Sequence, residues 1–294
     1  MDQAEQLRSI IKANNIQKSL ARVIAVTSGK GGVGKSSTSI NLAIQLRKLG
    51  QRVIILDADF GLANIEIMFG IMPKNNLSDV IYQGKSIREI ITWGPMEVGF
   101  ISGGSGIAEL SNLSRNYLVS IIRNLSELDS IADIIIVDTG AGISDAVLEF
   151  LVASGEILLV TTPEPTSITD SYSLVKALGN HPGFSWQTSQ VKVIANKVES
   201  HNEGQALFDK LNAVVGRYLK LPITYLGAVP WDNHLTKAVM QQMPVSLHAP
   251  GAKSAQAYEV IAAKLMNKEL NRNVTKRGVA AFFSYIVTGR KNND

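Results

Sequence analysis

Short runs of apolar residues recur along the chain, and most of them end in a polar residue. Runs that read as strands lie at residues 22–27, 52–57, 98–102, 133–138, 156–162, 191–196 and 223–229. Stretches with helical spacing of apolar residues lie between most of them. Continuous apolar strands that alternate with helices are typical of a parallel sheet covered on both faces. The pattern therefore predicts an α/β fold with a doubly wound, mainly parallel sheet, and no linker or repeat divides it.

Two amphipathic segments flank this core. Apolar residues in 2–18 fall at helical spacing, which alone favours a helix packed on its own domain over a free arm. Near the other end, a stripe of large apolar residues lies between basic pairs: Val279, Phe282, Phe283, Ile286 and Val287. A short basic amphipathic helix is typical of a membrane-surface anchor, and we favour this over docking on the domain. The predicted division is an N-terminal arm at 1–19, a core domain at 20–271 and a membrane-targeting tail at 272–294.

Composition and charge narrow the class of protein. The 294 residues are 45% apolar, which is ample for a large core. There is no cysteine, which excludes disulfides, thiolate zinc sites and cysteine-ligated iron–sulfur clusters, and is compatible with the cytosol. No secretory signal or membrane-spanning run is present. The whole net charge of +4 lies in residues 272–294, so a nucleic-acid-binding face on the core is not expected.

A glycine-rich loop follows the first predicted strand. Residues 29–36 read GKGGVGKS, which fits G-x-x-x-x-G-K-[ST] in the strand–loop–helix context that this motif requires. Such a loop turns successive N–H groups towards a phosphate, while Lys35 reaches the β- and γ-phosphates and Ser36 binds Mg²⁺. A nucleotide-binding loop is therefore predicted, made of Gly31, Gly32, Val33, Gly34, Lys35, Ser36 and Ser37.

Carboxylates follow two of the predicted strands. Asp57 ends one strand, with Asp59 just beyond it, and Asp138 ends another before a glycine-containing DTGAG segment. Each could be only a turn signal. Beside a phosphate-binding loop they instead predict a magnesium site of Ser36, Asp57 and Asp138, with Asp59 positioning the attacking water.

Two loops are candidates for reading the base. Residues 196–199 read NKVE, close to the guanine-reading NKxD pattern but with glutamate in the last position. Residues 229–232 read VPWD and follow the last predicted strand. The loop features favour ATP, but a GTP-hydrolysing switch stays open.

The sequence GKGGVGKS resembles the deviant Walker A box of the MinD/ParA ATPases, and the likeness extends over residues 20–270. It implies a P-loop NTPase that uses ATP and Mg²⁺ and forms a homodimer. In that family the early lysine, here Lys30, crosses the interface to the partner's nucleotide, although a solvated loop lysine is the plain alternative. The implied catalytic residues are Lys30, Lys35 and Asp59. Asn196 would face adenine, with Pro230 and Asp232 beside the base and ribose.

Within this group, residues 2–8 resemble the activator motif of the FlhG (FleN) family of flagellar regulators. The resemblance implies that Gln3, Ala4, Leu7 and Arg8 stimulate an FlhF-type GTPase, that flagellar switch (C-ring) proteins are candidate partners, and that the protein regulates flagellar placement and number. It also implies a cytoplasmic protein that binds the anionic inner face of the cell membrane with ATP, through Phe282, Phe283, Ile286 and Val287. A MinD-type division-site regulator and a ParA-like partition ATPase are the alternatives.

Overall fold

The computed structural model describes residues 20–59, 64–103, 121–267 and 278–289. In this part of the chain an eight-stranded sheet has the order β3-β4-β2-β5-β1-β6-β7-β8, and only the β3–β4 pair is antiparallel. The strands are β1 (Arg22–Thr27), β2 (Val53–Ala58), β3 (Thr92–Trp93), β4 (Gly99–Ser102), β5 (Ile134–Thr139), β6 (Glu156–Thr161), β7 (Gln190–Val198) and β8 (Thr224–Pro230). The predicted doubly wound α/β fold is confirmed, and the short β3 is the strand that the sequence pattern missed.

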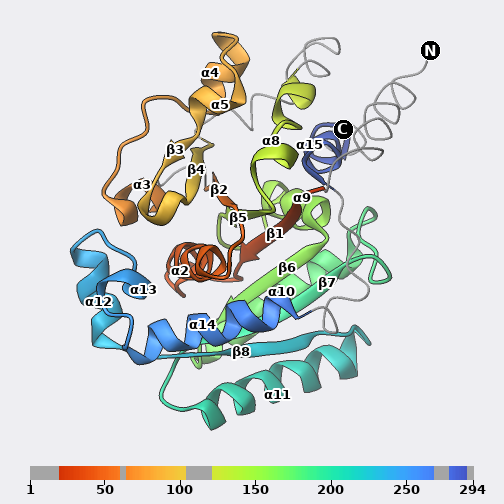
Figure 1. Ribbon diagram of the computed structural model, residues 1–294. Coiled ribbons are helices and arrows are strands. Elements are labelled where there is room, and N and C mark those ends of the chain that lie inside the picture. The colour runs from red at the N-terminus through yellow and green to blue at the C-terminus, as the bar shows by residue number, and fades with distance from the viewer. Residues whose placement is uncertain (1–19, 60–63, 104–120, 268–277, 290–294) are drawn as a thin grey trace.

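Helices cover both faces of the sheet (Figure 1). They are α2 (Lys35–Lys48), α3 (Asn64–Phe69), α4 (Leu77–Tyr82), α5 (Ile87–Ile90), α8 (Leu128–Ile131), α9 (Asp145–Ser154), α10 (Pro165–Asn180), α11 (His201–Tyr218), α12 (Asn233–Met240), α13 (Val245–His248), α14 (Lys253–Met266) and α15 (Gly278–Gly289), with a 3₁₀ turn at Pro95–Glu97. Side chains of α2 and α14 share one apolar cluster with the sheet, and those of α9, α10, α11 and α15 share the other. This two-sided cover explains why the strands are apolar throughout.

The central strand β1 contributes side chains to both apolar clusters. Ile24 and Val26 face the α2 and α14 side, whereas Val23 and Ala25 face the opposite side. Successive side chains of a strand point to opposite faces, so both parities must be apolar when both faces are covered.

The position of β1 decides where a ligand can bind. It lies between β5 and β6, and the chain continues to β2 on one side before it returns and passes to β6 on the other. In open α/β sheets a ligand crevice lies at such a switch point, beyond the carboxyl ends of the strands. The phosphate-binding loop follows β1 at this edge.

The position of α15 differs from the membrane-surface helix that we expected in the tail. The apolar stripe of α15 faces the domain: Val279, Phe282, Phe283 and Ile286 are each 1% exposed, and Val287 is 4% exposed. Phe282 stacks on Phe150 of α9 with 6.1 Å between ring centroids, and Figure 1 shows α15 beside α8 and α9. The preference for a membrane over docking is therefore wrong for this conformation, because the same apolar face that suits a lipid surface also fits a protein groove.

Parts of the predicted organisation lie outside the described residues. They include the whole arm at 1–19, with Gln3, Ala4, Leu7 and Arg8, and the basic residues that flank α15. Among the helices that the structure describes, none combines the length and the hydropathy needed to cross a bilayer.

Candidate nucleotide-binding site

The phosphate-binding loop needs glycine at specific points. Gly32 and Gly34 have φ values of +74° and +98°, in the left-handed region that L side chains rarely adopt. A Cβ on Gly29 would lie 2.2 Å from the backbone carbonyl carbon of Asp170 in α10. The loop can therefore turn tightly between β1 and α2 only with these glycines. Its backbone N–H groups lie next to the N-terminus of α2, which is the positive end of the helix dipole.

Lys35 is the first residue of α2 and is 8% exposed. Burial lowers the pKa of its ammonium, while the Asp138 and Asp59 carboxylates oppose this shift. A buried cation beside the loop and the two carboxylates can attract the negative charge of a phosphate.

Asp57 and Asp138 are each the residue before the last of neighbouring strands and lie at the same level, since they are paired in the β2–β5 register. Burial, with repulsion from Asp138, raises the pKa of Asp57 to about 7, although N–H groups of Asp59 and Ile65 oppose this. Burial also raises the pKa of Asp138 to about 6, against the hydroxyls of Ser36 and Ser39 and the charge of Lys35. The nearby charge of Lys35 therefore does not fully offset the desolvation of the two neighbouring carboxylates.

These residues fit a magnesium ion. Asp138 Oδ1 accepts a hydrogen bond of 2.7 Å from Ser39 Oγ, whereas its buried Oδ2 has no hydrogen-bond partner in the described part of the chain. Mg²⁺ prefers such oxygen ligands and is held by one or two carboxylates plus phosphate oxygens and water in nucleotide sites. Within the described ranges no cluster of three or more histidines, cysteines or carboxylates could hold a metal by itself. The site thus suits a metal that arrives with a nucleotide.

Asp59 lies next to this pair. Its backbone N–H donates to Asp57 Oδ1 over 3.2 Å, and its side chain is 3.5 Å from the Asn64 amide nitrogen. Its Oδ1 also lies close to Gly140 in the DTGAG segment. The half-buried carboxylate therefore sits between the β2 and β5 tips, and its role in positioning the attacking water stays a prediction.

Lys30 points towards its own chain. Its Nζ lies 2.7 Å from Glu164 Oε2 and 2.9 Å from Thr166 Oγ1, at the start of α10. Hydrogen bonding and attraction from Lys30 hold the pKa of Glu164 below its usual range. In this conformation the lysine is thus engaged within the protomer.

The tip of β7 supports the loop from the other side. Asn196 Nδ2 donates to the Val33 carbonyl over 2.7 Å, and Lys197 Nζ donates to the Gly32 carbonyl over 2.8 Å. A Cβ on Gly34 would lie 2.3 Å from Asn196 Nδ2. Asn196, the predicted base-reading residue of this segment, and its neighbour Lys197 are therefore in contact with the phosphate-binding loop.

The Asp232 carboxylate accepts hydrogen bonds from other residues of the protein. One oxygen accepts the His234 N–H at the start of α12, and the other accepts the N–H and hydroxyl of Ser254. Although partial burial alone would raise it, these bonds lower the pKa of Asp232 to about 2. Pro230 ends β8 just before this cap. Contact of either residue with a base or ribose stays a prediction.

Several contributors were not identified from the sequence. Ser39 is one turn beyond Ser36 and could have been inferred from helical spacing, while Lys197 lay within the examined NKVE segment. Glu164 and Thr166 carried no motif signal, and only their position after β6 brings them to this edge.

Known proteins share this chain's sequence and fold. The ParA family model, described as "NUBPL iron-transfer P-loop NTPase", matches residues 19–266. The chain is 40% identical over 262 residues to the antiactivator FleN of Pseudomonas aeruginosa, covering 89% of this chain and 91% of FleN. It is 33% identical over 294 residues to the flagellum site-determining protein YlxH of Helicobacter pylori, covering 97% and 98%. The structure of the septum site-determining protein MinD of Pyrococcus horikoshii, complexed with Mg-ADP, aligns with a TM-score of 0.65 at 22% identity over 85% of this chain and 98% of that one.

Proposed function

Because this chain belongs to the ParA/MinD family of P-loop NTPases, we propose that it hydrolyses ATP as an ATP-dependent homodimer that regulates flagellar placement and number. The observation that carries the enzymatic part is the gathering of Lys35, Asp57 and Asp138 beside the glycine-rich loop. Fold likeness alone would not specify chemistry, whereas these side chains supply the charges that a magnesium–nucleotide complex needs.

In the proposed reaction each residue has one task. The loop N–H groups and Lys35 bind the phosphates, and Ser36, Asp57 and Asp138 would hold the metal. Asp59 orients the attacking water. Lys30 would leave Glu164 and reach the nucleotide of the partner protomer, where a cation can stabilise the charge of the transferring phosphoryl group. Mg²⁺ supplies charge neutralisation at the phosphates when it is bound.

ATP is proposed as the nucleotide. Asn196 and Lys197 contact loop carbonyls, so in this conformation neither side chain presents the paired arrangement of a guanine-reading motif. Glu199 carries the extra methylene at the position where that motif has aspartate. Competition of ATP and GTP for a fluorescent nucleotide tests this, and a preference for GTP would favour the switch alternative.

The flagellar role rests on the relatives. FleN is named an antiactivator and YlxH a flagellum site-determining protein, and this chain covers nearly the whole length of both. MinD proteins are less similar, which makes a division-site role the second candidate. The family model's iron transfer does not carry over through a cysteine-ligated cluster, because the chain has no cysteine.

Two further interactions belong to the proposal. The arm, through Gln3, Ala4, Leu7 and Arg8, would stimulate an FlhF-type GTPase. The stripe of α15 would bind the anionic inner membrane surface once ATP-dependent dimerisation allows the helix to leave the domain, because two weak anchors then act together.

A peptide of residues 1–20 tests the flagellar assignment. It should stimulate an FlhF-type GTPase, and Gln3→Ala or Arg8→Ala in the intact protein should weaken that stimulation without changing ATP hydrolysis. Pull-down with the ATP-loaded protein, compared with an arm-deleted form, would identify C-ring partners. If peptide and intact protein are both inert towards that GTPase, only the ATPase assignment remains.

A further inference from the structure

The carboxyl end of β7 departs from the regular geometry of a strand. Asn196 and Val198 pair with consecutive residues of β8, which are Val229 and Pro230. Lys197 is therefore an extra residue in β7. It has a φ of +58°, in the left-handed region that residues other than glycine rarely adopt. This combination is a β-bulge, which bends a strand and can redirect its side chains.

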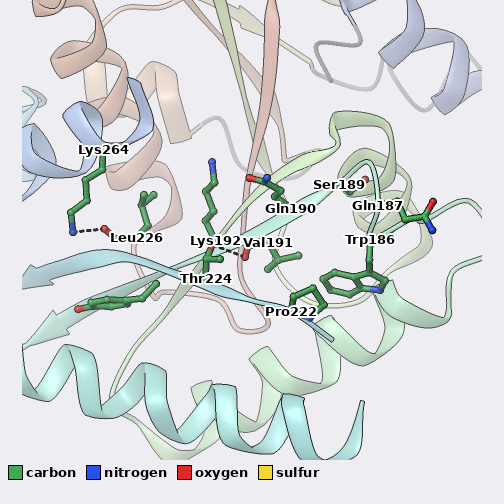
Figure 2. A pocket seen from close by; sticks show the side chains of 11 residues that line it. Trp186, Gln187, Ser189, Gln190, Val191, Lys192, Pro222, Thr224, Leu226 and Lys264 are labelled. Atoms are coloured by element: carbon green, nitrogen blue, oxygen red, sulfur yellow. Dashed lines mark hydrogen bonds between the residues drawn. The ribbon is translucent and has the colours of Figure 1, made fainter. Parts of the chain in front are cut away.

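The bulge changes which side of the sheet the residues of β7 face. In the amino half of the strand, Val191 and Lys192 point to opposite sides, as successive residues of a strand do (Figure 2). Ala195 and Val198 are three positions apart, yet both lie in one apolar cluster with Leu207 of α11. The extra residue accounts for this, because it lets the two residues between them point to the same side, away from that cluster.

Both of these side chains reach the phosphate-binding loop. Asn196 Nδ2 donates to the Val33 carbonyl over 2.7 Å, and Lys197 Nζ donates to the Gly32 carbonyl over 2.8 Å. The two carbonyls belong to consecutive peptide units of the loop. Two neighbouring side chains of β7 therefore hold two neighbouring peptide units. The approach is close, since a Cβ on Gly34 would lie 2.3 Å from the Asn196 nitrogen.

These contacts determine where two N–H groups of the loop point. A trans peptide unit is planar, so its C=O and N–H bonds point in opposite directions, and the described part of the chain has no cis peptide bond. The Gly32 carbonyl shares its unit with the Val33 N–H, and the Val33 carbonyl shares its unit with the Gly34 N–H. Because both carbonyls point towards β7, both N–H groups point away from it. The Val33 side chain is buried in the core and anchors the same part of the loop.

We propose that Asn196 and Lys197 are positioning residues for phosphate binding, which hold the loop with the Val33 and Gly34 N–H groups facing the phosphates. N–H groups of a glycine-rich loop before a helix are the groups that bind phosphate oxygens. A loop that the protein itself holds in this geometry loses less conformational freedom on binding, which increases affinity. The inference rests on the proposed nucleotide-binding function, and it gives Asn196 a task separate from any contact with the base.

The unfavourable backbone of Lys197 supports this role. A left-handed residue other than glycine costs conformational energy, and such residues are often found at functional sites. Lys197 is half-buried, and its charge also helps to hold the pKa of Glu164 below its usual range. The lysine thus lies at the edge of the sheet where Lys30 meets Glu164. The bulge places its ammonium against the loop instead of against α11.

Inorganic tripolyphosphate tests the proposal, because it has the phosphates of ATP but no base. Its inhibition constant is measured on the full-length protein with Mg²⁺, by displacement of a fluorescent ATP analogue, and the constant for ATP is measured beside it. Lys197→Gly should weaken both ligands about tenfold or more, the usual effect of losing a hydrogen bond from a charged donor. Asn196→Ala should also weaken both, by similar factors for the two ligands.

Three comparisons separate positioning from a general effect on the fold. Glycine adopts a φ of +58° without strain, so the melting temperature of Lys197→Gly without ligand should not fall. Lys197→Arg should keep most of the affinity, since its guanidinium can donate to the same carbonyl. Lys220→Gly is the matched control, because Lys220 is an exposed lysine with a φ of +55° just after α11. It should leave both constants unchanged.

Other results would overturn the proposal. If Asn196→Ala weakens ATP but not tripolyphosphate, that residue acts on the base and not on the loop. Unchanged constants in Lys197→Gly, or an equal loss in Lys197→Arg, would remove Lys197 from phosphate binding. Binding of ATP but not of tripolyphosphate up to about 10 mM by the wild type would mean that the loop contributes too little to need positioning. If the wild type binds neither ligand, the proposed nucleotide-binding function fails, and this inference fails with it.

Discussion

The ammonium of Lys30 lies 2.7 Å from the Glu164 carboxylate of its own chain, so the residue proposed to act on a partner's nucleotide is held within the protomer. Both side chains are well exposed, at 38% for Lys30 and 58% for Glu164. An ion pair in such a position is screened by water and contributes little to stability. It can therefore be exchanged for a contact with phosphate when two protomers meet.

Lys30→Ala is expected to abolish ATP hydrolysis, because the negative charge of the transition state is then no longer stabilised by this cation. Phosphate release and sedimentation with ATP are the measurements, and Lys176→Ala, on the exposed side of α10, is the matched control. Full activity of a monomeric Lys30→Ala protein would contradict the dimer mechanism.

Glu164→Gln is expected to raise the dimer fraction a few-fold at limiting ATP, since Lys30 no longer has to leave a carboxylate. Sedimentation over a range of ATP concentrations measures this. The exposed Glu259→Gln serves as the control. A lower dimer fraction would show that Glu164 supports the dimer instead of competing with it.

Asp59→Ala should keep ATP binding and the dimer but slow hydrolysis by roughly 10²–10⁴-fold, the usual contribution of a general base. Single-turnover hydrolysis separates this effect from binding. Asp209→Ala, on the exposed face of α11, is the control. An unchanged rate would remove Asp59 from the mechanism.

The stabilisation by Mg²⁺ and nucleotide should depend on pH. Asp57 has a pKa of about 7 in the folded protein, above the value of about 3.9 in an unfolded chain, so the folded state without metal holds the extra proton in this window. The extra proton on Asp57 stabilises the folded state. This contribution to the free energy of unfolding is complete below about pH 4 and is lost as pH rises through 7. A metal competes with the proton for the same oxygens.

The gain in melting temperature caused by Mg-ADP over ADP alone should therefore grow between about pH 5 and pH 8. Differential scanning calorimetry measures it, and Asp57→Asn should flatten the dependence. A gain that is equal at both ends of the range would separate Asp57 from the metal.

Docking and membrane binding of α15 can be distinguished by two variants. The Asp129 carboxylate accepts the Val279 N–H at the start of α15, and loss of such a cap costs about 1 kcal/mol. Asp129→Ala should therefore increase binding to anionic vesicles several-fold, whereas Phe282→Asp should abolish it. Flotation assays measure both, with the exposed Glu127→Ala as control. If Asp129→Ala exposes α15 to protease but leaves vesicle binding unchanged, the tail is not the anchor.

Local sequence determined most of the nucleotide site. The strands are apolar at both odd and even positions, which predicted buried parallel strands. Because the carboxyl ends of such strands meet at one edge of the sheet, the sequence was enough to place Asp57, Asp59 and Asp138 near the glycine-rich loop. The conformational needs of Gly32 and Gly34 are equally local, since they follow from backbone sterics within a few residues.

Only the tertiary structure decided which surface or residue the α15 stripe, Lys30 and Asp232 each contact. The stripe of α15 is apolar in either environment, and burial against Phe150 depends on a helix more than a hundred residues away. Lys30 is held by Glu164 and Asp232 by Ser254, through contacts that no periodicity or spacing encodes. Periodicity reports that a face is apolar or a residue polar, but the identity of the contacting surface is set by how distant segments pack together.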